Sequence, residues 1–125
     1  MDWDILHFFD QHLEALPLYE ALEQQVRAQV PDVQVKVQKT QISFYNRHLF
    51  ACVSFLRVKR KKDLPPAYLV VTVGLARRLD SPRVAAAVEA YPGRWTHHIV
   101  VSAPEQIDGE LMGWVQEAAA FAAQK

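Results

Sequence analysis

The chain has 125 residues, in which 14 basic side chains balance 14 acidic ones, so the formal net charge is zero. This length suits a single domain, expected to span residues 1–125, and the balanced charge excludes a global field that would attract nucleic acid or an anionic membrane. The one cysteine, Cys52, excludes an internal disulfide and a multi-thiolate zinc site.

No stretch reaches the roughly 20 apolar residues that cross a bilayer. The acidic start Met1-Asp2-Trp3-Asp4 is unlike a secretory signal peptide. We therefore expect a cytoplasmic protein with no membrane partner. Cys52 lies in the apolar run Phe50-Ala51-Cys52-Val53 and is interpreted as a buried core thiol, because the sequence shows no neighbouring base that would activate it.

The first 30 residues predict two helices. Residues 3–16 form the first, started by Asp2 or Asp4, whose carboxylates suit a helix N-terminus. Pro17 is well placed to begin the second helix, which ends before Pro31 because the residue before a proline disfavours the α conformation. Apolar residues recur at helical spacing in both segments, namely Ile5, Phe9, Leu13 and Leu16, then Leu18, Leu22 and Val26.

At Val33 the apolar period changes from 3.6 to 2, which predicts strands. Asn46-Arg47-His48 is interpreted as a turn, and Lys61-Lys62-Asp63 as the tip of a basic hairpin. The fourth strand is nearly continuous in Leu and Val, which is typical of a central strand. The four predicted strands cover residues 33–38, 42–45, 49 to about 59, and 68–74.

The segment after residue 74 has a weaker pattern. Asp80-Ser81-Pro82 is typical of a helix start, so a short helix is predicted there. Val84 and Val88 would face inward from it, and Tyr91-Pro92-Gly93 would end it. His97 to Val101 is predicted to be a fifth strand.

A C-terminal helix completes the predicted order. It starts either at a capping box in Ser102-Ala103-Pro104-Glu105 or at a cap on Asp108. Strands in a block joined by tight turns favour an α+β fold, a mostly antiparallel sheet of about five strands with two N-terminal helices and one C-terminal helix packed on it. The inner stripe of the last helix is Ile107, Leu111, Val115, Ala118 and Ala122.

Several short motifs along the chain carry a resemblance to a known family. The sequence resembles an uncharacterised bacterial family, the domain of unknown function numbered 5655. The resemblance implies no established reaction, cofactor or catalytic residue, and it suits an accessory or binding module. The motifs are Phe8-Phe9, Leu18-Tyr19-Glu20-Ala21-Leu22, Lys39-Thr40-Gln41-Ile42-Ser43-Phe44, Phe50-Ala51, Arg94-Trp95-Thr96-His97-His98, and Ile107-Asp108 with Leu111 and Trp114.

The strongest compositional feature is a basic run at residues 57–62, which holds five of the 14 positive charges. It is interpreted either as a solvated hairpin tip or as a surface that contacts nucleic-acid phosphates. No aromatic residues alternate with the charges, so a base-stacking platform is not indicated. The residues that would contact nucleic acid are Lys59, Arg60, Lys61 and Lys62.

Strand alternation predicts a second candidate, one polar face of the sheet. Small or hydroxyl-bearing residues fall on one side of three strands, while their neighbours are apolar. If these sides share a face, that face suits a small-molecule site; the alternative is an ordinary wetted sheet face. The pairs are Ser43 with Tyr45, Cys52 with Ser54, and Tyr68 with Thr72.

A third candidate is the segment Arg94 to His98, which holds a guanidinium, an indole and two imidazoles. Because His97 and His98 point to opposite faces of a strand, they do not converge on one metal, and we expect neither metal nor cofactor. Arg94 could pair with an anion while one histidine titrates near neutral pH, or Trp95 could be core with Arg94 packed beside it.

A lysine beside a hydroxyl, Lys39-Thr40, is a fourth candidate and could bind phosphate, although no glycine-rich loop precedes it. No nucleophile elbow, catalytic carboxylate pair or dinucleotide fingerprint is present, so an enzyme is the least favoured hypothesis. We predict a non-enzymatic binding module whose sheet-face site takes an anionic small molecule or a protein segment. The alternative is nucleic-acid binding through residues 57–62, and the oligomeric state stays open. The predicted site residues are Lys39, Tyr45, Arg57, Arg94, Trp95, His97 and His98.

Overall fold

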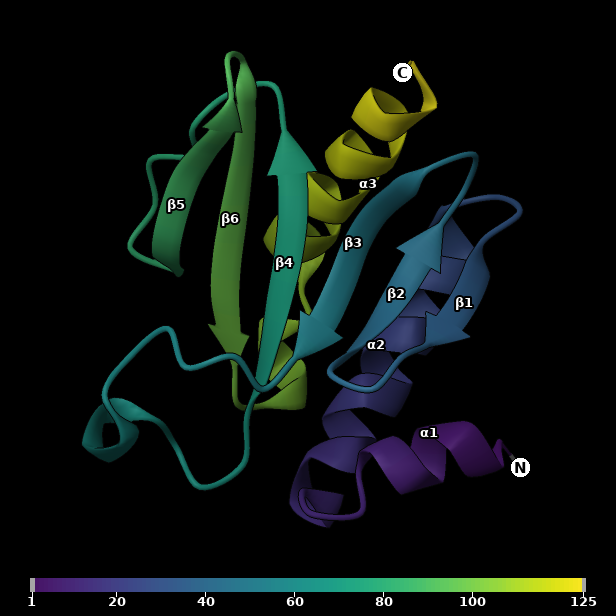
Figure 1. Ribbon diagram of the computed structural model, residues 1–125, viewed down its shortest axis with the longest axis vertical. Helices are drawn as coiled ribbons and strands as arrows, with labels where there is room; N and C mark the ends of the chain where they lie inside the picture. The colour runs from purple at the N-terminus through teal and green to yellow at the C-terminus, as the bar shows by residue number, and fades with distance from the viewer. Residues whose placement is uncertain (1, 125) are drawn as a thin grey trace.

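The computed structural model describes residues 2–124 (Figure 1). Within this range the α-helices are α1 (Trp3–Phe8), α2 (Leu16–Gln29) and α3 (Gly109–Ala123), and short 3₁₀ turns lie at Leu13–Ala15, Lys61–Asp63 and Pro104–Gln106. The strands of this range are β1 (Gln34–Val37), β2 (Gln41–Tyr45), β3 (Leu49–Ser54), β4 (Leu69–Leu75), β5 (Val84–Tyr91) and β6 (Arg94–Val101). The predicted α+β class is confirmed, but the described chain has six strands and not about five.

The N-terminal segment forms two helices, although the first is shorter than predicted. Asp2 caps α1, and its carboxylate accepts two backbone N–H groups at 3.0 and 3.2 Å. The prediction of one helix over residues 3–16 is wrong, because α1 ends at Phe8 and the chain turns before α2. The turn buries Phe9 completely, with its ring centroid 5.4 Å from that of Tyr19 on α2.

The strands form one sheet in the order β1-β2-β3-β4-β6-β5, and every neighbouring pair is antiparallel. β6 therefore lies between β4 and β5. After β4 the chain crosses to the edge of the sheet, forms β5 in the same direction as β4, and enters the antiparallel β6 through a tight turn at Gly93. This path places β6 against β4, which is a central strand as predicted.

The short helix predicted after Ser81 is wrong, because residues 84–91 form the edge strand β5. Alanine-rich segments favour helix in isolation. Here, however, Gly93 adopts a positive φ of 74° and closes a turn that aligns the segment with β6, so the backbone groups pair in a ladder. Ser81 caps no helix; its hydroxyl accepts the backbone N–H of Arg83 at 3.2 Å.

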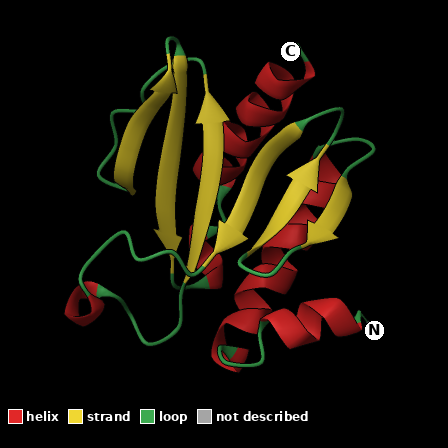
Figure 2. Cartoon of the chain, in the orientation of Figure 1, coloured by secondary structure: helices red, strands yellow, loops and turns green. Residues whose placement is uncertain are grey.

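The third strand is also shorter than predicted, since β3 ends at Ser54 and not near residue 59. Residues 55–68 form a loop with one 3₁₀ turn, which extends away from the sheet in Figure 2, so the predicted basic hairpin is wrong. Phe55 directs the chain out of the ladder. Its ring stacks on that of His12 at 3.9 Å between centroids and so packs against the N-terminal segment.

α2 and α3 cover one face of the sheet, and the opposite face is turned toward the viewer in Figure 1. The core lies between sheet and helices, where directly opposed strand residues are at most 1% exposed; these are Ile42, Val53, Val71 and Ile99. The predicted inner stripe of α3 is confirmed for Leu111, Val115, Ala118 and Ala122, which are all buried. Within the described residues, no helix is both long and apolar enough to cross a membrane.

Of the two starts predicted for the C-terminal helix, the one at Asp108 is correct. Its carboxylate accepts the Leu111 N–H at 3.0 Å at the N-terminus of α3. The segment that begins at Ser102 leads into a 3₁₀ turn instead. There the Gln106 side chain accepts the backbone N–H groups of Ser102 at 2.6 Å and of Ala103 at 3.2 Å.

Candidate functional site

A row of polar side chains crosses the face of the sheet that α2 and α3 leave uncovered. The strand register sets Ser43 opposite Cys52, Cys52 opposite Thr72, and Thr72 opposite His98. Directly opposed residues of antiparallel strands point to the same side. Four neighbouring strands, β2, β3, β4 and β6, therefore each contribute one polar or thiol group to this face.

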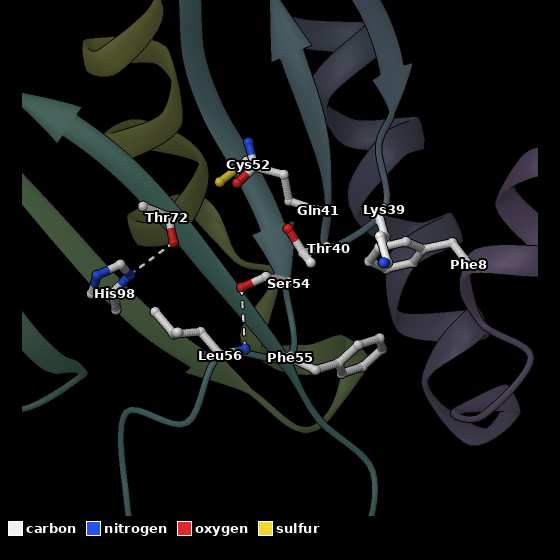
Figure 3. A pocket seen from close by; sticks show the side chains of 10 residues that line it. All are labelled: Phe8, Lys39, Thr40, Gln41, Cys52, Ser54, Phe55, Leu56, Thr72 and His98. Carbon is white, nitrogen blue, oxygen red and sulfur yellow. Dashed lines mark hydrogen bonds between the residues drawn. The ribbon is translucent and has the colours of Figure 1, made fainter.

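A pocket of about 470 Å³ opens at one end of this row (Figure 3). The turn between β1 and β2 supplies one wall, the end of β3 and the following loop supply another, and the last residue of α1 approaches from the side. Segments far apart in the sequence thus converge on it. The lining residues are Phe8, Lys39, Thr40, Gln41, Cys52, Ser54, Phe55, Leu56, Thr72 and His98.

Hydrogen bonds brace the turn that carries Lys39. Ser43 is completely buried, and its hydroxyl donates to the Gln38 side chain at 2.8 Å while accepting from the Gln41 side chain at 2.8 Å. The backbone N–H of Gln38 also donates to the Gln41 carbonyl at 2.8 Å and closes the turn. Ser43 therefore supports the rim of the pocket, while its neighbours in the row line the inside.

The inner end of the pocket is polar but uncharged. The Thr72 hydroxyl and Nδ1 of His98 are 2.8 Å apart and hydrogen-bonded. Burial lowers the pKa of His98 below its usual 6.5, so the imidazole is neutral at pH 7. Burial likewise raises the pKa of the Cys52 thiol, and the Thr72 hydroxyl opposes this effect more weakly. No thiolate–imidazolium pair is therefore favoured here.

The position of the Cys52 side chain contradicts one prediction. The thiol was expected in the core, yet the side chain is only half-buried and lines the pocket on the uncovered face. The apolar run around it is misleading because Ala51 and Val53 face the helices and are buried, while Cys52 lies between them and points the other way.

The pocket carries one positive charge. Among the described residues that line the pocket, Lys39 is the one with a charged side chain, and none is acidic. The apolar part of the lining comes from Phe8, Phe55 and Leu56, the last of which is 52% exposed. The arrangement can hold a ligand that combines a negative charge, an apolar body and hydrogen-bonding groups.

The structure brings together two of the seven predicted site residues, Lys39 and His98, in this pocket. Arg94 lies instead with its guanidinium 6.0 Å from the ring centroid of Phe121 on α3, and Trp95 lies under Arg78 at 5.7 Å. Tyr45 ends β2 at the far end from the turn that carries Lys39. Arg57 is exposed on the loop and lines a separate hollow with Lys61.

His97 lies on the opposite face of β6 from His98, as predicted, and it is completely buried toward the helices. Its Nε2 accepts the backbone N–H of Leu79 at 2.9 Å. Its Nδ1 has no hydrogen-bond partner among the described residues. Burial is the main cause that lowers the pKa of His97. His97 therefore anchors the segment between β4 and β5 and is not part of the pocket.

The basic segment lies on the loop of residues 55–68. Arg57, Lys59, Arg60, Lys61 and Lys62 are all exposed. Within the described chain, Arg60 is the member of this group held in an ion pair, with Asp63 at 3.1 Å. The other four charges are available to solvent or to a polyanion.

Phe8, Phe55 and Leu56 are pocket residues that the sequence did not indicate. Large apolar residues in a helix or beside a strand are typical of core, and no local signal separates a pocket wall from core. The expected absence of a metal site is untested, although residues 2–124 contain no cluster of three or more His, Cys, Asp or Glu side chains that could hold a metal ion.

Comparison with known proteins assigns the chain to a family but not to a reaction. The family model described as Domain of unknown function (DUF5655) matches residues 7–122, nearly the whole chain. No curated protein and no solved structure matches the sequence. The chemistry of the pocket is therefore the feature that indicates a function.

Proposed function

The chain belongs to the DUF5655 family, and we propose that it is a non-enzymatic binding module that holds a small organic anion in the sheet-face pocket. The observation that carries this proposal is the combination of Lys39 with a lining that contains no acidic residue among those described. A lone ammonium in such a pocket favours a negatively charged ligand over a cationic one.

The size and lining of the pocket support the same proposal. Its volume of about 470 Å³ is within the range of roughly 300–1,000 Å³ that is usual for small-molecule sites. Such sites combine an apolar lining with a few placed polar groups. Here Phe8 and Leu56 are apolar, whereas Thr40, Ser54 and Thr72 offer hydroxyl groups that can donate or accept hydrogen bonds.

The protonation states in the pocket favour binding over covalent chemistry. A nucleophilic cysteine needs a lowered pKa or an adjacent base. The pKa of Cys52 is raised by burial, and His98 is bonded through Nδ1 to Thr72. We further expect a bacterial cytoplasmic protein, which agrees with a free thiol; cell fractionation tests that part.

A screen of organic anions by thermal shift, followed by NMR titration, tests the proposal. A ligand at 100 times its dissociation constant stabilises the fold by about 2.7 kcal/mol, which is measurable in a domain of this size. We expect shifts of the amide signals of Cys52, Thr72 and His98. Lys39→Met should weaken binding, whereas Lys36→Met should not, because Lys36 is an exposed lysine of β1 that does not line the pocket. The proposal would be contradicted if Lys39→Met and Lys36→Met weakened binding equally, or if the protein bound only peptides.

Nucleic-acid binding by the loop is the second candidate, because Arg57, Lys59, Lys61 and Lys62 are exposed and outside the ion pairs of the described chain. It predicts an affinity that falls steeply with salt and that drops when Lys59, Lys61 and Lys62 are changed to Ala together. Lys39→Met would have little effect on such binding. A salt-independent affinity would exclude this alternative.

A further inference from the structure

The pocket has two chemically different ends, and each restricts the ligand. Figure 3 shows Lys39 and Phe8 at one side and the hydrogen-bonded pair Thr72 and His98 at the other. Leu56 and Phe55 lie along the edge between them. A ligand that uses the whole pocket must therefore present different groups at its two ends.

The charged end suits a single negative charge. Lys39 contributes one ammonium group, and no arginine lines the pocket among the described residues. Phosphate dianions are typically held by several charged or backbone donors, such as an arginine fork or a helix N-terminus. The helix that reaches this pocket does so with its last residue, Phe8, and the C-terminal end of a helix does not attract anions. A carboxylate matches this end better than a phosphate ester.

The opposite end suits an uncharged polar group. Burial keeps both Cys52 and His98 in their neutral forms, so a ligand charge placed beside them would meet the same desolvation penalty. The Thr72 hydroxyl either donates to Nδ1 of His98 or accepts from it, depending on the tautomer of the imidazole. Its remaining hydrogen-bonding capacity can therefore serve a hydroxyl or carbonyl group of the ligand.

Resting on the proposed function, we infer that the pocket takes a monocarboxylate with an apolar body and an uncharged hydrogen-bonding group at its far end, the chemistry of a hydroxyaryl acetate. The carboxylate pairs with Lys39, the apolar body lies against Leu56 and the two phenylalanines, and the far group bonds to Thr72. Phosphate esters and amines of the same size bind more weakly.

Five matched probes test the inference by NMR titration of the full chain: 4-hydroxyphenylacetate, phenylacetate, 4-hydroxyphenethyl alcohol, tyramine and phenyl phosphate. We expect 4-hydroxyphenylacetate to bind most tightly and to shift the signals of Thr72 and His98. Lys39→Met should weaken the binding of this probe by about two- to fivefold, as for an exposed charge pair. Thr72→Val, which keeps the side-chain shape, should weaken it by about two- to tenfold and leave phenylacetate unchanged. Lys36→Met is the control and should bind all probes like the unchanged protein.

The other outcomes separate the two proposals. If the alcohol, tyramine or phenyl phosphate binds as tightly as the carboxylate and shifts the same signals, the inferred ligand class is wrong but the pocket is a binding site. If none of the probes binds while another organic anion shifts the signals of Cys52, Thr72 and His98, the inferred ligand class is wrong but the proposed binding function is supported. If no organic anion perturbs these residues, the binding function itself is overturned.

Discussion

His97 and His98 are adjacent in the chain, yet one step along β6 gives them opposite environments. His97 is held in the core against Leu79, whereas His98 shares a hydrogen bond with Thr72 at the pocket. Because successive strand residues point to opposite faces, their separation was predictable from the sequence. Which of the two would be buried was not predictable, since it depends on the side that the helices cover.

Mild acid should destabilise the protein through these two residues. Burial lowers the pKa of His97 and of His98 below the usual 6.5, so the unfolded chain binds protons that the folded chain does not. Their contribution is fully present above about pH 6.5 and is lost as the pH falls toward their folded pKa values. Urea unfolding at pH 7.5 and 5.5 should show a lower midpoint at pH 5.5. His97→Gln should reduce this difference, whereas His48→Gln, at an exposed turn, should retain it.

The Cys52 thiol should react slowly. Burial raises its pKa above the usual 9.0, and alkylating agents attack the thiolate. At pH 7.5 the folded protein should react with iodoacetamide more slowly than glutathione does, and the rate should rise as the pH increases. The chain unfolded in urea should react like glutathione. A folded-state rate equal to that of glutathione would contradict the burial of this side chain.

Between β4 and β5, the chain is tied to α3 by two arginines. Arg83 donates to Asp108, to Glu110 and to the Gln106 carbonyl at 2.6–3.1 Å. Its guanidinium also lies 5.7 Å from the Trp114 ring centroid. Arg77 makes two hydrogen bonds to Glu117 at 2.8 and 2.9 Å in a more exposed position. Arg83 therefore makes more contacts than Arg77 and is less exposed.

Arg83→Met should therefore cost more stability than Arg77→Met. We expect a loss of about 1–2 kcal/mol for Arg83→Met, which removes several charge-assisted hydrogen bonds from a largely covered side chain. Arg77→Met should cost less, because surface ion pairs of this kind contribute little to stability. Chemical denaturation of both variants measures the difference, and equal losses would argue against a special role for Arg83.

The β5–β6 turn and α3 supply a matched pair of glycine substitutions. Gly93 has a φ of 74°, a region that costs an L residue about 1–2 kcal/mol, so Gly93→Ala should destabilise by about that amount. At Gly113, inside α3, an added Cβ meets no atom within 4 Å, so Gly113→Ala should stabilise by about 0.5–1 kcal/mol. Thermal melts of the two variants should move in opposite directions.

At the scale of the whole molecule, the strands of the described chain all belong to one sheet. β6 joins the C-terminal hairpin to β4, and α3 packs on β3 and β4 near the N-terminal strands. Residues 1–125 are predicted to be a single domain. Far-UV circular dichroism and tryptophan fluorescence, to which the buried Trp114 contributes, should therefore report one coincident unfolding transition in urea. Two separated transitions would contradict this prediction.

Local patterns in the sequence were sufficient for much of this fold. Asp2 and Asp108 identify helix starts through side-chain capping, and Pro31 marks a helix end. Alternation identifies the strand near Val35, and a nearly continuous run of Leu and Val identifies the strand around Val71. The polar side of β2, β3 and β4 was also readable, because alternation depends only on neighbouring residues. The lining residues of the pocket that the sequence indicated in advance are Lys39, Thr40, Cys52, Ser54, Thr72 and His98.

Tertiary packing decided the rest. Residues 84–91 have no strong period of their own, and they become a strand because the turn at Gly93 offers β6 as a partner. Residues 55–68 leave the sheet because Phe55 packs against the N-terminal segment. The pocket joins Phe8, Lys39 and His98, which lie on separate elements. Such convergence follows from strand order and helix docking, which depend on contacts between residues distant in the chain, whereas capping and alternation depend on neighbours alone.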